Sequence, residues 1–247
     1  MRKSLVAKCG IWACAFSLTA VIAGCGSTKI FYANFEADTV GGLPAENPAG
    51  DPSGDLIWLS TSTMNGIATV VNSGELPGKT MRYANVDVPI YNRYVGFFGK
   101  EITLGPSAKI YAFWNGYIVN DVNGSGLEIW LGNSHFMAMA LIRFKDGKIY
   151  YLSGPGSPSP YVEAGTYTPN RSHFILITVD KATSQYTVGI LQSGGGSTIN
   201  IGPRAVLNPE ALATSRPALY MLYGEENSGN GRYFIDNVTI SEKEPDM

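Results

Sequence analysis

The chain has few cysteines, few charged residues and no clear helical pattern. Its three cysteines, Cys9, Cys14 and Cys25, all lie near the start of a 247-residue sequence. Charged residues make up only 15% of the chain, against about a quarter in an average domain. After Gly24, no long segment repeats apolar residues at helical spacing. These absences exclude a disulfide scaffold, thiol catalysis and a helical bundle.

The sign of the charge excludes another class of partner. The formal net charge is −2, and residues 1–24 hold three of the 18 Lys and Arg residues but none of the 20 Asp and Glu residues. The rest of the chain is therefore more acidic than the whole. We expect no nucleic-acid partner, because such a partner requires a basic surface.

The first 24 residues have the layout of a secretion signal. Basic residues precede an apolar stretch at 11–23, which is too short for a membrane span of about 20 residues. The stretch ends in Ile22-Ala23-Gly24-Cys25, which resembles the lipobox of bacterial lipoproteins. The resemblance implies cleavage before Cys25, a lipid on its thiol and anchoring in the membrane. An ordinary secretion signal with a chance cysteine is the alternative.

The residue after the lipidated cysteine bears on the membrane to which the protein is sent. Lipoproteins kept at the inner membrane often carry Asp there, whereas this chain has Gly26. The resemblance therefore implies a cell-envelope protein anchored in the outer membrane. We expect a signal peptide at 1–24, a lipidated Cys25 with a tether to residue 29, one domain at 30–241 and a tail at 242–247.

The domain reads as many short strands separated by Gly, Pro, Asn and Asp. Alternation is clear in 126–132 and 135–144, and an Asp-Gly turn at 146–147 predicts a tight hairpin. Further strands are expected at 101–104, 172–180, 185–192 and 232–240, among others. With no crossover helices, the pattern predicts an all-β fold, an antiparallel two-sheet β-sandwich or jelly roll.

The two ends of the domain carry more specific motifs. Residues 31–44 contain Phe-Glu followed by Gly-Gly-Leu-Pro, and residues 233–240 read Tyr-Phe-Ile-Asp-Asn-Val-Thr-Ile. These motifs resemble the concanavalin A-like lectin/glucanase sandwiches, including laminin G-like domains. Related carbohydrate-binding modules often hold a structural calcium ion where the end strands meet. The resemblance offers Glu36, Asp38 and Asp236 as its ligands.

A physical argument also concerns Asp236. In a regular strand its carboxylate would share a face with apolar side chains, where it needs a partner or a metal ion. The alternative is that Asp236 accepts hydrogen bonds from neighbouring backbone N–H groups or lies at a bulge.

The glucanases of this superfamily place three acids at alternating positions of one strand, because glycoside hydrolysis uses paired carboxylates. The nearest segment here has Glu128, but Trp130 and Gly132 stand at the next two positions. The usual glucanase mechanism is therefore not expected. A divergent hydrolase or lyase that uses Glu128, His135 and Arg143 remains open, and their convergence in a groove would favour it.

The remaining chemistry is that of a sugar-binding surface, since an aromatic ring can stack on a pyranose while polar neighbours donate and accept hydrogen bonds. The residues expected to bind a glycan are Trp114, Tyr117, Glu128, Trp130, His135 and Arg143. The primary hypothesis is a non-catalytic, carbohydrate-binding envelope lipoprotein. The alternative is a structural or protein-interaction lipoprotein without a glycan ligand, which fully buried tryptophans would favour.

Overall fold

The computed structural model describes ten segments of the chain. They are residues 29–44, 57–59, 68–84, 95–106, 108–119, 126–154, 161–194, 198–213, 216–223 and 232–245. The predicted signal peptide and Cys25 lie outside the described residues. No helix in these segments is long and apolar enough to cross a membrane.

The described strands form two antiparallel sheets, as the alternation predicted. The eight-stranded sheet has the order β13-β12-β11-β6-β15-β4-β3, and β1 also pairs with β15. Its strands are β1 (Lys29–Ala33), β3 (Ala68–Val71), β4 (Thr80–Ala84), β6 (Lys109–Val119), β11 (Ser172–Asp180), β12 (Gln185–Gln192), β13 (Thr198–Ala205) and β15 (Arg232–Ser241). The first and last of these strands lie side by side.

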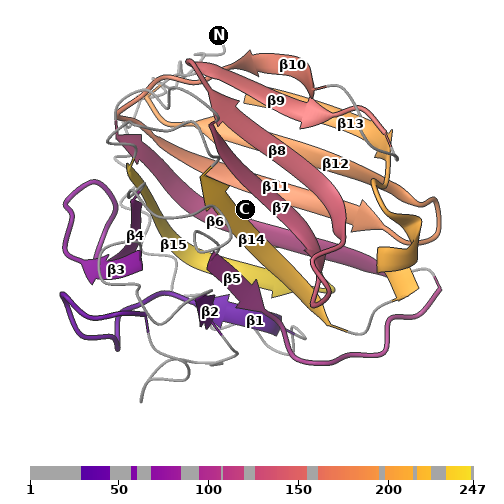
Figure 1. Cartoon of the computed structure of the whole chain (residues 1–247), viewed down its shortest axis with the longest axis horizontal. Helices are drawn as coiled ribbons and strands as arrows, with labels where there is room; N and C mark the ends of the chain where they lie inside the picture. Colours follow the sequence, from indigo (N-terminus) through magenta and orange to yellow (C-terminus); the bar gives the residue numbers. More distant parts are fainter. Residues whose placement is uncertain are drawn as a thin grey trace, which may run out of the picture.

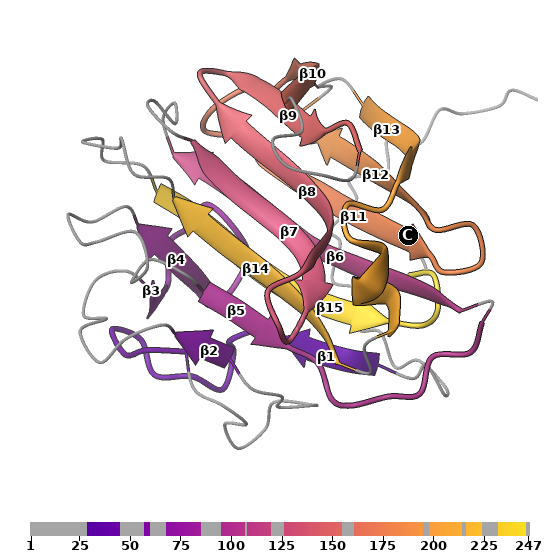
Figure 2. The ribbon, with the colours of Figure 1, turned by 45° about the vertical axis from the view of Figure 1, so that its right-hand side comes forward.

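The seven-stranded sheet has the order β10-β9-β8-β7-β14-β5-β2. Its strands are β2 (Ile57–Leu59), β5 (Val95–Phe98), β7 (Leu127–Asn133), β8 (Ala138–Lys145), β9 (Lys148–Leu152), β10 (Tyr161–Thr166) and β14 (Pro217–Tyr223). A short 3-10 helix, η2 (Pro209–Ala213), connects the sheets between β13 and β14. Figures 1 and 2 show the seven-stranded sheet in front of the eight-stranded one.

Apolar side chains from both sheets fill the space between them. Leu127, Ile129 and Leu131 of β7 are fully buried, and they face residues such as Ile175 and Ile177 of β11 in one continuous core. Each strand therefore has an inner and an outer face, because successive side chains point to opposite sides. Burying one such side chain stabilises the fold by about 1.5–3 kcal/mol, so the core fixes which residues remain for the outer faces.

Several strand boundaries differ from the sequence-based expectation. The Asp-Gly hairpin forms between β8 and β9, with Asp146 and Gly147 both at positive φ, as a type I′ turn requires. The expected strand at 101–104 is irregular, although Ile102 and Leu104 still pack on the core. The strand expected at 135–144 begins only at Ala138, because residues 134–137 form a turn. The edge strand β10 was not expected.

Candidate binding face on the seven-stranded sheet

A row of polar side chains crosses four strands on the outer face of the seven-stranded sheet. Glu128 of β7 pairs with Arg143 of β8, Arg143 with Tyr150 of β9, and Tyr150 with Glu163 of β10. Partners in an antiparallel pair lie on the same side of the sheet. The core residues next to them in sequence, such as Ile129 and Ile142, point inward, so this row points outward.

Three of the outward side chains form a hydrogen-bonded group. The Tyr161 hydroxyl donates to Glu128 Oε1, and Arg143 Nε lies 3.8 Å from the same oxygen. The guanidinium carbon of Arg143 lies 4.6 Å from the centre of the Tyr161 ring, a cation–π geometry. Burial and the hydrogen bond to Glu128 raise the pKa of Tyr161. Its hydroxyl therefore stays protonated at neutral pH and acts as a donor.

Next to this group, aromatic rings stack on the same face. We call Trp130, Tyr220 and Phe136 the outer cluster. Trp130 stacks on Tyr220 at 5.1 Å between ring centres, and Phe136 lies tilted over Tyr220 at 4.9 Å. Trp130 is only 6% exposed and Tyr220 is fully buried, whereas Phe136 is 46% exposed. Of these three rings, only Phe136 therefore presents a large surface to solvent.

The turn that holds Phe136 is built around the buried side chain of Asn133. Asn133 Oδ1 accepts hydrogen bonds from the backbone N–H groups of His135 and Met137, at 2.9 and 3.1 Å. The Asn133 carbonyl oxygen accepts from the Tyr220 hydroxyl at 2.7 Å and from the Phe136 N–H at 3.1 Å. Phe136 itself has a φ of 60°, which costs a bulky residue roughly 1–3 kcal/mol. The surrounding hydrogen bonds hold it there.

Trp114 does not belong to this face, although the sequence placed it among the residues expected to bind a glycan. It is fully buried on the inner side of β6, where its indole Nε1 donates to the Tyr233 hydroxyl at 2.7 Å. The Tyr233 hydroxyl also lies 3.2 Å from His173 Nε2. We call Trp114, Tyr233 and His173 the inner cluster. Its burial leaves no surface for a ligand.

The tautomer of His173 follows from its partners. The hydrogen bond between the His173 ring and the Arg171 backbone raises the pKa of His173, so a ring N–H donates in it. Nε2 faces Tyr233, so the donor to Arg171 is Nδ1. In the neutral ring Nε2 is then unprotonated and accepts the Tyr233 hydroxyl proton, while the Tyr233 oxygen accepts from Trp114. Burial between the Phe144 and Tyr233 rings lowers the pKa of His173 to about 4, so the ring is neutral near neutral pH.

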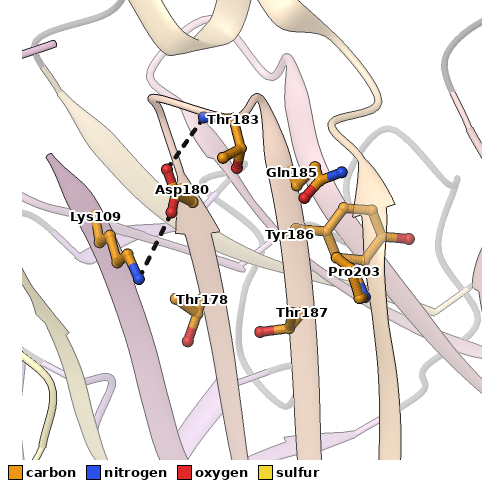
Figure 3. Close-up of a pocket in the computed structure, with 8 residues that line it drawn as sticks. All are labelled: Lys109, Thr178, Asp180, Thr183, Gln185, Tyr186, Thr187 and Pro203. Atoms are coloured by element: carbon orange, nitrogen blue, oxygen red, sulfur yellow. Dashed lines mark hydrogen bonds and ion pairs between the residues drawn. The ribbon is translucent and has the colours of Figure 1, made fainter. Parts of the chain in front are cut away.

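Tyr117 lies on the opposite side of the sandwich from Glu128. It projects half-buried from the outer face of the eight-stranded sheet, with its ring 6.3 Å from that of Phe234. The same sheet carries a shallow pocket near the ends of β6, β11, β12 and β13. Figure 3 shows that Asp180 in this pocket already pairs with Lys109 and accepts a hydrogen bond from the Thr183 backbone N–H. Neither feature adds a residue to the binding face.

His135 is exposed beside Phe136, in the turn that follows β7. Glu128 lies near the other end of that strand. Five residue steps separate Glu128 from Asn133, which corresponds to roughly 17 Å along a strand. Glu128 and Arg143 therefore come together, but His135 does not join them. The catalytic trio considered from the sequence does not form.

The predicted calcium ligands do not fit a metal site. Among the described residues, no group of three or more Asp, Glu, His or Cys side chains is placed to hold a metal ion. Instead, the ammonium of Lys79 donates to the carbonyl oxygens of Glu36 and Asp38, at 2.7 and 2.8 Å. The Lys79 N–H donates to Glu36 Oε1 at 2.9 Å. The Lys79 side chain and backbone thus hold the segment that contains Glu36 and Asp38.

Asp236 lies at a bulge, as the alternative interpretation expected. The pairing of β15 with β6 shifts between Asp236 and Thr239, and Asn237 has a φ of 53°. Both oxygens of Asp236 accept hydrogen bonds from Asn237, from its N–H and its side-chain amide, each at 2.7 Å. Burial and the nearby Glu36 raise the pKa of Asp236 to about 7, although the Asn237 N–H opposes this shift.

Sequence reasoning missed Tyr161, Phe136 and Asn133. Tyr161 begins an edge strand whose side chains are mostly exposed or half-buried, so apolar alternation did not reveal it. Phe136 fitted the alternation of 135–144 and was assigned to a strand. The sequence Asn-Ser-His at 133–135 is a turn signal, and it predicts that the preceding strand ends at residue 133.

No protein family and no curated protein matches the sequence, but solved structures match the fold. The β-glucanase catalytic domain of glycoside hydrolase family 131 from Podospora anserina has a TM-score of 0.58 and 11% identity, covering 88% of this chain and 97% of that one. The family 131 catalytic domain from Coprinopsis cinerea has a TM-score of 0.57 and 7% identity, covering 89% and 95%.

A sialidase matches with a TM-score of 0.52 and 15% identity over 87% of this chain, but this chain spans only 19% of the sialidase. At such identities the likenesses show the fold alone. They establish the class of protein as a two-sheet β-sandwich of the kind that glucanase catalytic domains have. This agrees, for the fold, with the predicted resemblance to concanavalin A-like sandwiches.

Proposed function

We propose that this chain is a lipid-anchored cell-envelope protein that binds carbohydrate, without cleaving it, on the outer face of its seven-stranded sheet. The observation that carries the proposal is the group formed by Glu128, Arg143 and Tyr161. It places a carboxylate, a guanidinium and a partly exposed ring side by side. Such a combination suits a sugar. The sugar hydroxyl groups form hydrogen bonds with the paired donors and acceptors, and the C–H face of the sugar packs on the aromatic ring.

The accessible rings are not the ones expected from the sequence. Tyr161 is 37% exposed and Phe136 is 46% exposed, while the tryptophan beneath is nearly covered. Tyr161 would therefore make the stacking contact near Glu128, and Trp130 would support the face from below. Arg143 is already paired with Glu128, so the group as a whole is close to neutral. It suits a hydroxyl-rich ligand better than a strongly charged one.

The spacing of carboxylates supports a binding role over hydrolysis. In the strands of this sheet the acids are Glu128 and Glu163. They stand three strand spacings apart in the row, roughly 14 Å at the backbone. Glycosidases need their two carboxyl groups about 5–9.5 Å apart. Glu163 also pairs with Lys148 Nζ at 2.8 Å, which holds it away from Glu128.

The protein-interaction alternative has one observation in its favour. Both tryptophan side chains that the structure describes, Trp114 and Trp130, are buried. The exposed rings of Phe136 and Tyr161 could equally contact a protein partner, and such a lipoprotein would bind no sugar. Binding measurements distinguish the two functions.

The test is binding of residues 26–247, which include every described strand, to a broad glycan array with calcium and with chelator. We expect specific binding that is the same in both conditions, because Lys79 fulfils the cation role. Tyr161→Phe should lower the affinity by about tenfold, or 1.4 kcal/mol. Tyr117→Phe, on the opposite sheet, is the matched control and should bind like the wild type. Absence of binding in both conditions would favour the protein-interaction alternative.

The anchor has a separate test. Cells that express the full chain should incorporate labelled fatty acid into it, and Cys25→Ser should abolish both the label and the membrane fraction. Labelling that survives the substitution would contradict lipidation at Cys25.

A further inference from the structure

The turn between β7 and β8 has features that its packing role does not explain. Phe136 is held at a φ of 60°, in a region that bulky residues rarely adopt. Its ring is nevertheless 46% exposed. A residue such as Asn or Gly would occupy this position with less strain. The turn thus keeps a large apolar ring at the surface in a conformation that disfavours it.

The surrounding contacts hold this arrangement firmly. The buried Asn133 side chain accepts two backbone N–H groups of the turn, and the Ser134 N–H donates to the carbonyl oxygen of Arg216 on the chain leading into β14. Within the part of the chain that the structure describes, Asn133 Nδ2 has no hydrogen-bond partner. The turn therefore contains strain and an unsatisfied buried amide. Such a combination is typical of functional sites.

The position of the turn relates it to the proposed site. Phe136 rests on Tyr220, Tyr220 stacks on Trp130, and Trp130 is two residues from Glu128 on the same face of β7. The exposed Phe136 and the Glu128 group thus stand at opposite ends of one strand. Along β7 the backbone runs roughly 17 Å from Glu128 to Asn133, where the turn begins, and this length equals several linked sugars.

We propose that Phe136 is a second stacking platform of the same binding face, and that the ligand is an extended glycan chain that contacts both Phe136 and the Glu128 group. The inference rests on the proposed function and adds the form of the ligand. His135, exposed next to Phe136, provides hydrogen bonds to the sugar at that end. A monosaccharide would reach only one of the two ends.

The test uses residues 26–247 with oligosaccharides of one to six sugars from β-glucan, xylan and mannan. We expect wild-type affinity to rise with chain length until the chain spans both ends. Phe136→Asn should lower the affinity for the longest chains by at least tenfold and leave that for monosaccharides unchanged. Phe136→Tyr should retain binding. Leu191→Asn, at an exposed apolar residue of the other sheet, is the matched control and should have no effect.

Thermal unfolding separates binding from folding. Because Asn tolerates a positive φ, Phe136→Asn should keep its Tm within a few degrees of the wild type. A large drop in Tm would show that the ring serves packing on Tyr220, and would overturn the inference. Two further results would also overturn the inference, provided that Tyr161→Phe still weakens binding. One is that Phe136→Asn binds long chains as well as the wild type does, and the other is that the affinity does not depend on chain length. If the wild type binds no sugar of any length, the proposed function itself fails.

Discussion

The molecule contains two clusters built from the same kinds of residue, one on each sheet. The inner cluster joins Trp114 and Tyr233 to His173 between the sheets, and every polar atom named in it has a partner. The outer cluster joins Trp130 and Tyr220 to Phe136, and it ends in an exposed ring on a strained turn. The difference teaches that residue type alone does not decide whether an aromatic group is available to a ligand. The inner cluster is enclosed between the sheets, whereas the outer cluster reaches the surface at Phe136.

The largest expected difference is in stability. Trp114→Ala should lower the free energy of unfolding by about 4 kcal/mol, because it leaves a cavity in the core and removes the donor to Tyr233. Trp130→Ala should cost about 2 kcal/mol, because solvent and neighbouring side chains can fill the space on an outer face. Urea denaturation measures both. A larger loss for Trp130→Ala would reverse the assignment of the clusters.

The inner cluster also depends on a glycine. A Cβ at Gly116 would lie 2.0 Å from the Tyr233 hydroxyl and 2.6 Å from His173 Nε2. Gly116→Ala should therefore cost about 3 kcal/mol, again by urea denaturation. Gly105→Ala, where a Cβ meets nothing within 4 Å, is the control and should leave stability nearly unchanged. Equal stability of the two variants would mean that the inner cluster is not tightly packed.

Acid should act on the inner cluster through His173. Its pKa of about 4 lies below the ordinary 6.5, so the unfolded chain takes up the proton first as the pH falls. Stability from this group is present above pH 6.5 and is lost toward pH 4, by about 3 kcal/mol.

Asp236 has the opposite effect on stability, because its pKa is raised from 3.8 to about 7. Its contribution is present below pH 3.8 and is lost as the pH rises through 7.

The two groups should nearly cancel in the wild type. Stability measured by urea denaturation should therefore change little between pH 7 and pH 4. Asp236→Asn removes one of the two opposing effects and should reveal a loss of about 3 kcal/mol over the same range. The variant would contradict this account if its stability were as flat with pH as that of the wild type.

The smallest effect compares two hydroxyl groups. Tyr233→Phe leaves Trp114 Nε1 and His173 Nε2 buried without their shared partner and should cost about 2 kcal/mol of stability. Tyr161→Phe removes a hydrogen bond at a partly exposed site, so it should change stability by less than about 0.5 kcal/mol while weakening sugar binding. If Tyr161→Phe were the more destabilising, its group would have a structural role.

How far the sequence predicts these clusters depends on the strand. In β7, Leu127, Ile129 and Leu131 alternate with Glu128 and Trp130, so the outward direction of the last two followed from the pattern. In β6 the letters KIYAFWNGYIV place aromatic residues on both faces. Alternation there leaves two possible orientations, and only the pairing with β15 and β11 turns Trp114 inward.

The rest of the site depends on irregular backbone. The bulge at Asn237 reverses the alternation of β15, so Asp236 faces outward with Phe234 while Val238 and Ile240 enter the core. The Asn133 turn removes Phe136 from the strand that its spacing suggested. Both depend on side-chain hydrogen bonds to the backbone, which a pattern of apolar and polar residues does not encode. The fold class was therefore more predictable than the site.

The most direct test of the binding face is hydrogen–deuterium exchange of residues 26–247 with and without the oligosaccharide that binds best on the array. The account predicts slower exchange in β7, β8, β10 and residues 134–137, with no change in β11 and β12 of the opposite sheet. Protection confined to the eight-stranded sheet would contradict the claim that Glu128, Arg143, Tyr161 and Phe136 form the ligand-binding face.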